Sequence, residues 1–231
     1  AKTMQTILPD LNMDEILEIS KIYSVSWLLS KQNPIITQRP FRTVHHTASS
    51  ISIVWWWNKA KPWEISLSHK WILFLDEVLE FPKQVLEVLR QPLEDGVITI
   101  NRVNSSFTYP AKFVLVWALN PCPCGYLTDK DKQCICSQDQ IKRYRAKLSW
   151  PMMDRIDIFL EVPKVDTNDF WFAKTFINQE SSTDIKQRVQ KARDIQLKRF
   201  VWTKITSNSQ MWQKEILKYC NLDEKSQNIL K

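Results

Sequence analysis

The hydrophobic pattern of the chain is clearest at residues 72–77, where four apolar residues run directly into Asp76 and Glu77. A short continuous apolar run predicts a strand buried on both faces, as in a parallel sheet covered by helices. Residues 112–120 form a second buried run, which ends in Asn120. Because ligands of open α/β sheets bind at the carboxyl ends of the strands, we expect Asp76, Glu77 and Asn120 to share one edge of a sheet.

Helical patterns surround these two runs. Residues 1–9 resemble the end of a helix, and Asn12 is a suitable N-cap for the next one, which we expect to reach Tyr23. Pro82 suits the first position of another helix, which Pro92 is expected to stop. Later apolar patterns predict a strand at residues 158–162 and helices at residues 183–200, 213–219 and 223–230.

Two further stretches have a different character. Residues 97–102 and 107–109 flank a polar turn, which predicts a β-hairpin with Arg102 near its tip. Residues 34–69 show no regular period, so we expect a loop docked on the surface. The basic side chains of this loop are candidates for contacting phosphates, namely Arg39, Arg42, Lys59 and Lys61.

The acid pair and the asparagine suggest a chemistry. Asp76 could hold Mg²⁺ through its water shell, and Glu77 could polarise a water for attack on a γ-phosphate, as in a Walker B motif. Asn120 could orient that water or sense the γ-phosphate. Two bland alternatives remain open: a strand that stops at two solvated acids, and an Asn that caps a loop before Pro121.

Four of the five cysteines form a C-x-C-x9-C-x-C array, made of Cys122, Cys124, Cys134 and Cys136. Four thiolates in two close pairs suit a tetrahedral structural zinc ion. A reduced polar loop without metal is an equally open interpretation. Cys220 lies far from this array and is expected to be buried.

The composition sets broad limits. The chain has 231 residues, a net charge of +7 and a pI of about 9.1, which permits a nucleic-acid partner without requiring one. No apolar run reaches the length of a membrane span, and no signal-peptide pattern opens the chain. An odd number of cysteines without such a signal favours reduced thiols or metal binding, so we expect a cytoplasmic protein.

The balance of Gly and Trp is abnormal, because the chain has 2 Gly and 11 Trp. Ordinary usage would give roughly 16 Gly, and a sheet protein needs Gly in its turns. Several Trp residues stand where turns are expected, namely Trp55–Trp57, Trp63, Trp71 and Trp150. We favour the interpretation that these are glycines, from a codon that the source organism reads as Gly. An aromatic platform that stacks on bases is the alternative.

Taken together, the motifs resemble those of the magnesium-chelatase-related AAA+ ATPases of the competence-protein ComM type. The resemblance is strongest over residues 35–165, where the family has Gly in place of the Trp residues just named. Its main segments are residues 40–42, 45–49, 62–77, 87–96, 120–125, 140–144 and 154–157.

The resemblance implies an AAA+ P-loop NTPase fold of the α/β class, with a three-layer core over residues 1–165 and the start of a helical lid over residues 166–231. It implies that Asp76 holds Mg²⁺, Glu77 is the catalytic base, Asn120 is sensor 1 and Arg155 is an arginine finger acting on the ATP of the next subunit. The hairpin that includes Arg102 and Asn104 would be a presensor-1 hairpin pointing at DNA. The phosphate loop and the sensor 2 arginine have no match here, so we expect this fragment to bind ATP poorly and to be inactive alone.

The leading functional hypothesis is therefore an ATP-driven, ring-forming DNA translocase or helicase, usually a hexamer, that drives branch migration in natural transformation. A second hypothesis is a magnesium-chelatase-like or MoxR-like ATPase that remodels a protein partner. A third is a zinc-stapled binding module without catalysis. DNA-stimulated ATP turnover separates the first two, and an upstream phosphate loop would argue against the third.

Overall fold

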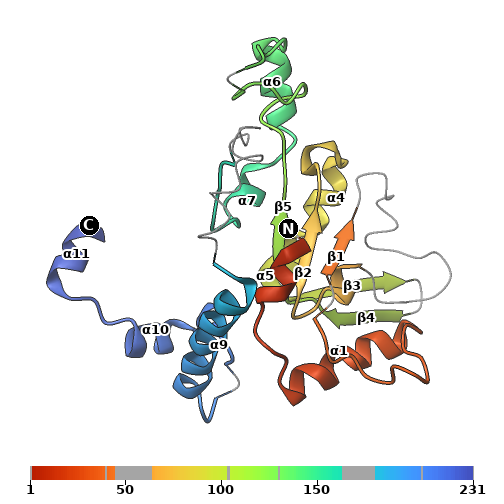
Figure 1. The fold of residues 1–231 in the computed structure, drawn as a ribbon, viewed down its shortest axis with the longest axis vertical. Helices are drawn as coiled ribbons and strands as arrows, with labels where there is room; N and C mark the ends of the chain where they lie inside the picture. Colours follow the sequence, from red (N-terminus) through yellow and green to blue (C-terminus); the bar gives the residue numbers. More distant parts are fainter. Residues whose placement is uncertain are drawn as a thin grey trace. The chain divides into compact units, whose positions relative to one another are not determined.

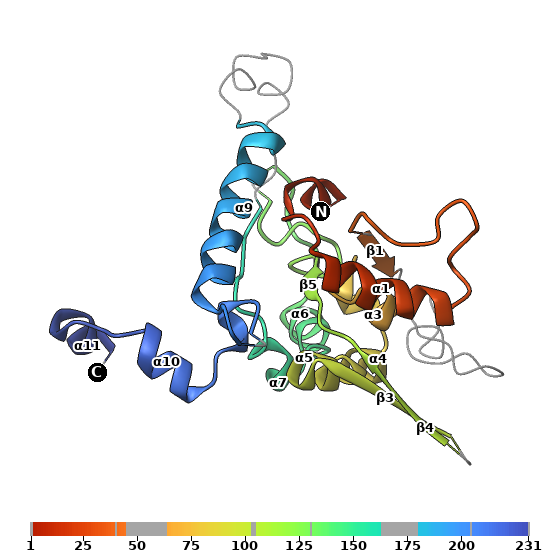
Figure 2. The same cartoon turned by 90° about the horizontal axis from the view of Figure 1, so that it is seen from below.

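The computed structural model describes residues 2–39, 41–44, 64–102, 105–129, 131–162, 180–203 and 205–230. The chain forms two compact units: one contains residues 1–5 and 10–179, and the other contains residues 6–9 and 180–231. Figures 1 and 2 show their elements. The expected domain boundary at residue 165 lies among residues 163–179, outside the described part, so it stays a prediction.

The first unit is built on a parallel sheet of three strands in the order β1-β2-β5 (Figure 1). These strands are β1 (Phe41–Val44), β2 (Ile72–Leu75) and β5 (Val114–Trp117). The central strand is buried on both faces, since Ile72, Leu73 and Leu75 are at most 1% exposed. The prediction of an α/β protein with a buried parallel strand before Asp76 is therefore confirmed.

The helices of the first unit are α1 (Met13–Val25), α3 (Glu64–Leu67), η2 (Val78–Glu80), α4 (Lys83–Val88), α5 (Arg90–Asp95), α6 (Gln138–Arg145) and α7 (Trp150–Met153). The short helix η1 (Lys2–Ile7) has residues in both units. The cap predicted at Asn12 is confirmed: its side chain accepts from the Glu15 amide, and the Glu15 carboxylate accepts from the Asn12 amide. This capping box fixes where α1 begins.

Two hydrophobic clusters hold the first unit together. The larger one joins the Leu73–Leu75 face of β2 to α4, the Tyr144 side of α6 and Met152 of α7. The smaller one joins α1, through Ile19 and Tyr23, to Trp71 just before β2. Because β2 and its approach contribute to both clusters, this strand is the structural centre of the unit.

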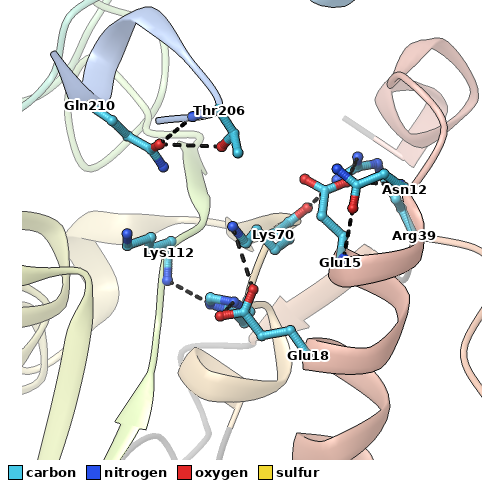
Figure 3. Close-up of polar contacts among 9 residues, drawn as sticks. Asn12, Glu15, Glu18, Arg39, Lys70, Lys112, Thr206 and Gln210 are labelled. Carbon is cyan, nitrogen blue, oxygen red and sulfur yellow. Dashed lines mark hydrogen bonds and ion pairs between the residues drawn. The ribbon is translucent and has the colours of Figure 1, made fainter. Parts of the chain in front are cut away.

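A polar network reinforces the contact between α1 and the approach to β2 (Figure 3). The Arg39 guanidinium pairs with Glu15 at 3.0 Å and donates to the Lys70 carbonyl at 2.6 Å. The Glu18 carboxylate lies 3.3 Å from Nε2 of His69 and 3.6 Å from the Lys70 ammonium. Nδ1 of His69 accepts from the Lys112 amide at 3.0 Å, which also ties in the residues just before β5.

The predicted hairpin is confirmed as β3 (Val97–Arg102) and β4 (Ser105–Pro110), which pair antiparallel with Arg102 opposite Ser105. Figure 2 shows it extending away from the sheet. Gly96, at φ +66°, ends α5 in the left-handed conformation and leads directly into β3.

Three sequence-based predictions about elements are wrong. Residues 41–44 were expected in a loop, but they pair along β2, because a single apolar-polar alternation is too short to recognise without its partner strand. Residues 158–162 are not a strand: they are described, and no described strand pairs with them. Pro92 does not stop a helix but lies in the first turn of α5, where amides have no partner inside the helix.

The second apolar run is also less buried than expected. Val114 in β5 is 53% exposed, whereas Ile72, Leu73 and Leu75 of β2 are buried. Among the described strands β5 pairs with β2 alone, so it forms an edge of this sheet. Apolar content does not tell a central strand from an edge strand, because that depends on what lies beside it.

The second unit contains the helices α9 (Ser182–Arg199), η4 (Asn208–Gln210), α10 (Gln213–Tyr219) and α11 (Glu224–Leu230). These bounds confirm the three later helices predicted from the sequence. Ser181 caps α9 by accepting from the Asp184 amide. Phe200, just after α9, is 2% exposed and packs edge-on against Tyr219 at a ring distance of 5.7 Å.

Two tryptophans stand in backbone conformations that favour glycine. Trp27 has φ 60° and Trp202 has φ 74°. At the end of α1 the Trp27 amide donates to Ser24 and the Leu28 amide to Tyr23, which is a Schellman motif with Trp27 at the position that Gly usually occupies. Both indole side chains are largely exposed, at 80% and 99%. These two positions support the glycine interpretation.

The tryptophans from which the glycine interpretation started support it less strongly. Trp71 is 1% exposed and its indole N–H has no hydrogen-bond partner, an arrangement that costs stability. Trp150 is 81% exposed at the start of α7. Trp55–Trp57 and Trp63 lie outside the described residues.

Candidate functional site

The carboxyl ends of β2 and β5 meet as the sequence predicts. Leu75 pairs with Trp117, and the ladder continues because the Ala118 amide donates to the Leu75 carbonyl at 2.9 Å. The Val78 amide then donates to the Ala118 carbonyl, also at 2.9 Å. Asp76 and Glu77 therefore lie between Leu75 and Val78, the two residues that are hydrogen-bonded to Ala118 at the end of β5. Asn120 follows Ala118 by two residues.

We call Asp76, Glu77 and Asn120 the acidic edge. All three side chains are exposed, so they are accessible to a ligand at this edge of the sheet. The expectation that both runs end at one edge is confirmed by the pairing. The chemical role of each residue stays a prediction.

The backbone of Glu77 is unusual. It has φ 50° and ψ 49°, a left-handed conformation that a residue other than Gly adopts only at a cost. The residues that follow, Val78 and Leu79, are buried in η2 and hold this turn in place. Oδ1 of Asp76 accepts from the Glu77 amide at 3.1 Å, which links the two acids directly. Such strain occurs where a fold holds a functional side chain in a set direction.

The donor set at the acidic edge fits magnesium. Carboxylate and amide oxygens are the protein ligands that this hard cation accepts, usually while it keeps part of its water shell. One oxygen of Asp76 is engaged by the Glu77 amide, and its carboxylate remains exposed to solvent. Asp76 would therefore hold the ion at this edge, where Glu77 follows it in the chain and Asn120 follows the paired strand β5.

Arg155 follows α7 and is held inside its own chain. Its guanidinium donates to the carboxylate of Glu94 on α5 and to the Pro151 carbonyl. The side chain is 25% exposed. The sequence predicted Arg155 as a residue that projects towards a neighbouring subunit, but it missed Glu94. A pairing between residues 94 and 155 leaves no signal in a single sequence.

The cysteine array is gathered at one place. The sulfur of Cys122 lies 3.4 Å from that of Cys124 and 3.6 Å from that of Cys134, and Cys124 lies 3.6 Å from Cys134. With Cys136 included, the four sulfur atoms all lie within 4.8 Å of one another. The prediction for Cys220 is wrong, since it is exposed. It follows α10 among short polar helices, where the described residues offer little apolar cover.

The thiols of this array differ in acidity. Backbone N–H groups of Tyr126 and Ile135 point at Cys124 and lower the pKa of its thiol to about 6. Burial, opposed by a backbone hydrogen bond with Cys124 and aided by the neighbouring thiols, raises the pKa of Cys136 to about 12. Backbone amides within the loop thus favour the charged form of the Cys124 thiol.

The residues predicted to contact DNA can be placed only in part. Arg102 ends β3 at the tip of the hairpin, as expected. Asn104 lies outside the described residues.

The two arginines proposed for phosphate contact have other partners. Arg42 forms a two-pronged ion pair with Glu64, with Nε donating to Oε2 at 2.5 Å, and Arg39 pairs with Glu15. Both guanidinium groups lie among folded elements and brace them. Lys59 and Lys61 lie outside the described residues.

None of the helices among the described residues is both long and apolar enough to cross a membrane.

Comparison with known proteins gives a family for this chain. The family model described as magnesium chelatase, subunit ChlI, matches residues 1–170, and the model of its C-terminal part matches residues 179–231. The protein YifB of Escherichia coli is 39% identical over 223 residues, which cover 96% of this chain and 42% of YifB. The competence protein ComM of Haemophilus influenzae is 38% identical over 229 residues, which cover 97% of this chain and 42% of ComM.

The chain thus spans 42% of the length of these two relatives. Among solved structures, NtrX from Brucella abortus aligns with 54% of this chain and 25% of its own at 17% identity, with a TM-score of 0.35. This chain therefore belongs to the magnesium chelatase subunit ChlI family and is a member of its ComM type.

Proposed function

We propose that this chain is part of the ATPase module of an AAA+ ATP hydrolase. The observation that carries the proposal is the parallel pairing of β2 and β5, which delivers two carboxylates and an amide to one accessible edge. Families of α/β proteins bind their ligands at this edge of the sheet. Membership of the magnesium chelatase family makes ATP the ligand of choice.

Each residue of the acidic edge has a role in this proposal. Asp76 holds magnesium, which neutralises charge on the phosphates when ATP is bound. Glu77 accepts a proton from the attacking water, and its fixed left-handed backbone keeps the carboxylate in one direction. Asn120 orients the same water through its amide. The exposure of all three side chains supports access by a nucleotide.

Arg155 acts on the ATP of the next subunit in a ring, usually a hexamer in this family. An arginine finger needs a side chain that is near the subunit surface and held in one orientation. Arg155 is partly exposed and is oriented by Glu94 and the Pro151 carbonyl, which supports this role. Glu94 is then a positioning residue on α5.

The motor acts on DNA in the branch-migration step of natural transformation. The similarity to a competence protein, the net charge of +7 and the projecting hairpin of β3 and β4 support a DNA substrate. The hairpin would be the presensor-1 hairpin, with Arg102 and Asn104 at its tip. The helices of the second unit would form the start of the lid.

The test is ATP turnover by the full-length gene product, with and without DNA. We expect Glu77→Gln to lower turnover about 10²–10⁴-fold, the usual contribution of a catalytic base. Asp95→Asn is the matched control, since Asp95 is an exposed acid at the end of α5, away from the strand ends. Equal turnover in Glu77→Gln and the control would refute the assignment of the base.

The effect of DNA decides between the two motor hypotheses. A rise in turnover with DNA, lost when Arg102 is replaced by Ala, supports a DNA motor. Turnover that ignores DNA points to the protein-remodelling alternative. No turnover in the full-length protein leaves the zinc-stapled binding module.

A further inference from the structure

The four cysteines of residues 122–136, the cysteine loop, have the spacing of a metal centre. A tetrahedral zinc ion with Zn–S bonds near 2.3 Å places its sulfur ligands about 3.8 Å apart. Three of the sulfur–sulfur distances here are 3.4, 3.6 and 3.6 Å. A disulfide would bring two sulfurs to about 2.0 Å, and all four cysteines are free.

The backbone of the loop is shaped around these sulfurs. The Gly125 amide donates to the Cys122 carbonyl at 3.0 Å and closes a tight turn over the first cysteine pair. Gly125 has φ +82°, and a Cβ there would meet nothing within 4 Å, so the turn requires Gly for its conformation rather than for space. One of only two glycines in the chain therefore serves this turn.

Charges around the loop complement a metal centre with four thiolates, which carries a net charge of −2. A hollow of about 580 Å³ is lined by Cys124 and Cys136 and also by Arg143 of α6 and by Lys147. The Lys132 ammonium lies 5.0 Å from the ring centre of Tyr126, within the loop. Cations near thiolate ligands lower the cost of holding them deprotonated together.

We propose that Cys122, Cys124, Cys134 and Cys136 bind one structural zinc ion. Four thiolates fill a tetrahedral shell, so no position is open for water and the ion takes no part in hydrolysis. The proposal stands on the loop alone and does not depend on ATP hydrolysis by the acidic edge.

The position of the loop in the chain indicates a structural role for the ion. The loop begins two residues after Asn120 and ends at Ser137, the N-cap of α6. Arg145 of α6 donates to the Pro121 carbonyl at 3.2 Å, which links the same two segments by a hydrogen bond. Figure 1 shows α6 beyond the carboxyl end of β5. Zinc thus fastens α6 to the segment that carries Asn120.

The test is the metal content of the full-length protein purified without chelator, measured by mass spectrometry of the elements. We expect one zinc per chain, and expect cobalt exchanged into the site to show the d–d absorption of a tetrahedral thiolate complex. Cys134→Ser should reduce bound zinc to background. Cys220→Ser is the matched control, because Cys220 is exposed and lies outside the loop, and it should keep its zinc.

A folding control keeps the test decisive. If Cys134→Ser is insoluble, titration of zinc into chelator-treated wild type, followed by a thiol-reactive dye, gives the same answer: zinc should protect four thiols. Protection of none, iron in place of zinc, or equal loss of zinc in Cys220→Ser would overturn the proposal.

Discussion

The acidic edge and the cysteine loop follow one another in the chain, yet they are built in different ways. Asp76 and Asn120 are brought to one edge only because β2 and β5 pair across a long stretch of sequence. The four cysteines lie within residues 122–136 and meet through two tight turns. The edge is a product of the whole sheet, whereas the loop forms its own site.

This difference predicts how each site responds to damage. A site assembled by the sheet can lose one side chain and keep its fold, because the backbone pairing remains. A site that holds its own loop together loses its local structure when a ligand or the metal is removed. Changes at the edge should therefore affect activity, and changes in the loop should affect stability first.

The largest effect is expected at Arg155, which tests whether the edge is completed by a second subunit. Arg155→Ala should lower ATP turnover by about 10³–10⁵-fold, the contribution of an arginine finger, while thermal unfolding changes little. The partly exposed pair with Glu94 is worth at most about 1 kcal/mol. Mixing Arg155→Ala subunits with Glu77→Gln subunits should restore part of the activity, because one interface then has both groups. Absence of any restoration would show that each subunit completes its own site.

Removal of zinc from the cysteine loop should give the next largest effect. Free zinc at a thousand times its dissociation constant stabilises the folded protein by about 4 kcal/mol. A chelator should lower the free energy of unfolding by about that amount in the wild type and in Cys220→Ser. If the chelator does not change the melting curve, the cysteine loop does not depend on metal for its stability, and the predicted difference between the two sites is wrong.

A smaller effect tests the helix end at Trp27, which is another locally determined feature. Trp27→Gly should stabilise the protein by about 1 kcal/mol, because a residue with a Cβ is strained in the left-handed conformation. Trp212→Gly is the control, since Trp212 has φ −90°, and it should bring no gain in stability.

The mass of the protein isolated from its source decides whether position 27 is glycine there. A mass that corresponds to tryptophan at positions 27 and 202 would refute the glycine interpretation.

The smallest effect concerns Glu18, whose partners come from distant parts of the chain. Its hydrogen bond with His69, opposed by partial burial and aided by Lys70, lowers its pKa to about 2 (Figure 3). A lowered folded-state pKa means that Glu18 stabilises the fold above its ordinary pKa of 4.5, and that this stability is lost as the pH falls towards 2. The carboxylate is 44% exposed, so screening limits the effect to under about 1 kcal/mol.

Glu18→Gln should therefore flatten the dependence of stability on pH between 4.5 and 2. Chemical denaturation at several pH values measures this directly. A variant with the same pH profile as the wild type would show that solvent screens this pair completely.

Local features of the fold were predictable because neighbouring residues decide them. The capping box at Asn12, the hairpin from Val97 to Pro110 and the helices α10 and α11 all depend on contacts between residues close in sequence. The four cysteines are close in sequence too, and their two close pairs indicated a shared site, although a loop without metal was equally open.

The errors fall where distant partners decide the outcome. Residues 41–44 form a strand because β2 lies beside them. Residues 158–162 form none, because no described strand pairs with them. Pro92 was misplaced because the break between α4 and α5 put it in a first turn. A single sequence does not record which surfaces are available for pairing.

The amino-acid sequence by itself determined the two apolar runs, the side chains at their ends and the family to which the chain belongs. The tertiary structure alone decided that β2 lies between β1 and β5 in the described sheet, that Glu77 holds a left-handed backbone, and that Arg155 pairs with Glu94. The physical reason is that periodicity and capping are properties of adjacent residues, whereas burial, strain and ion pairing depend on which distant groups come into contact.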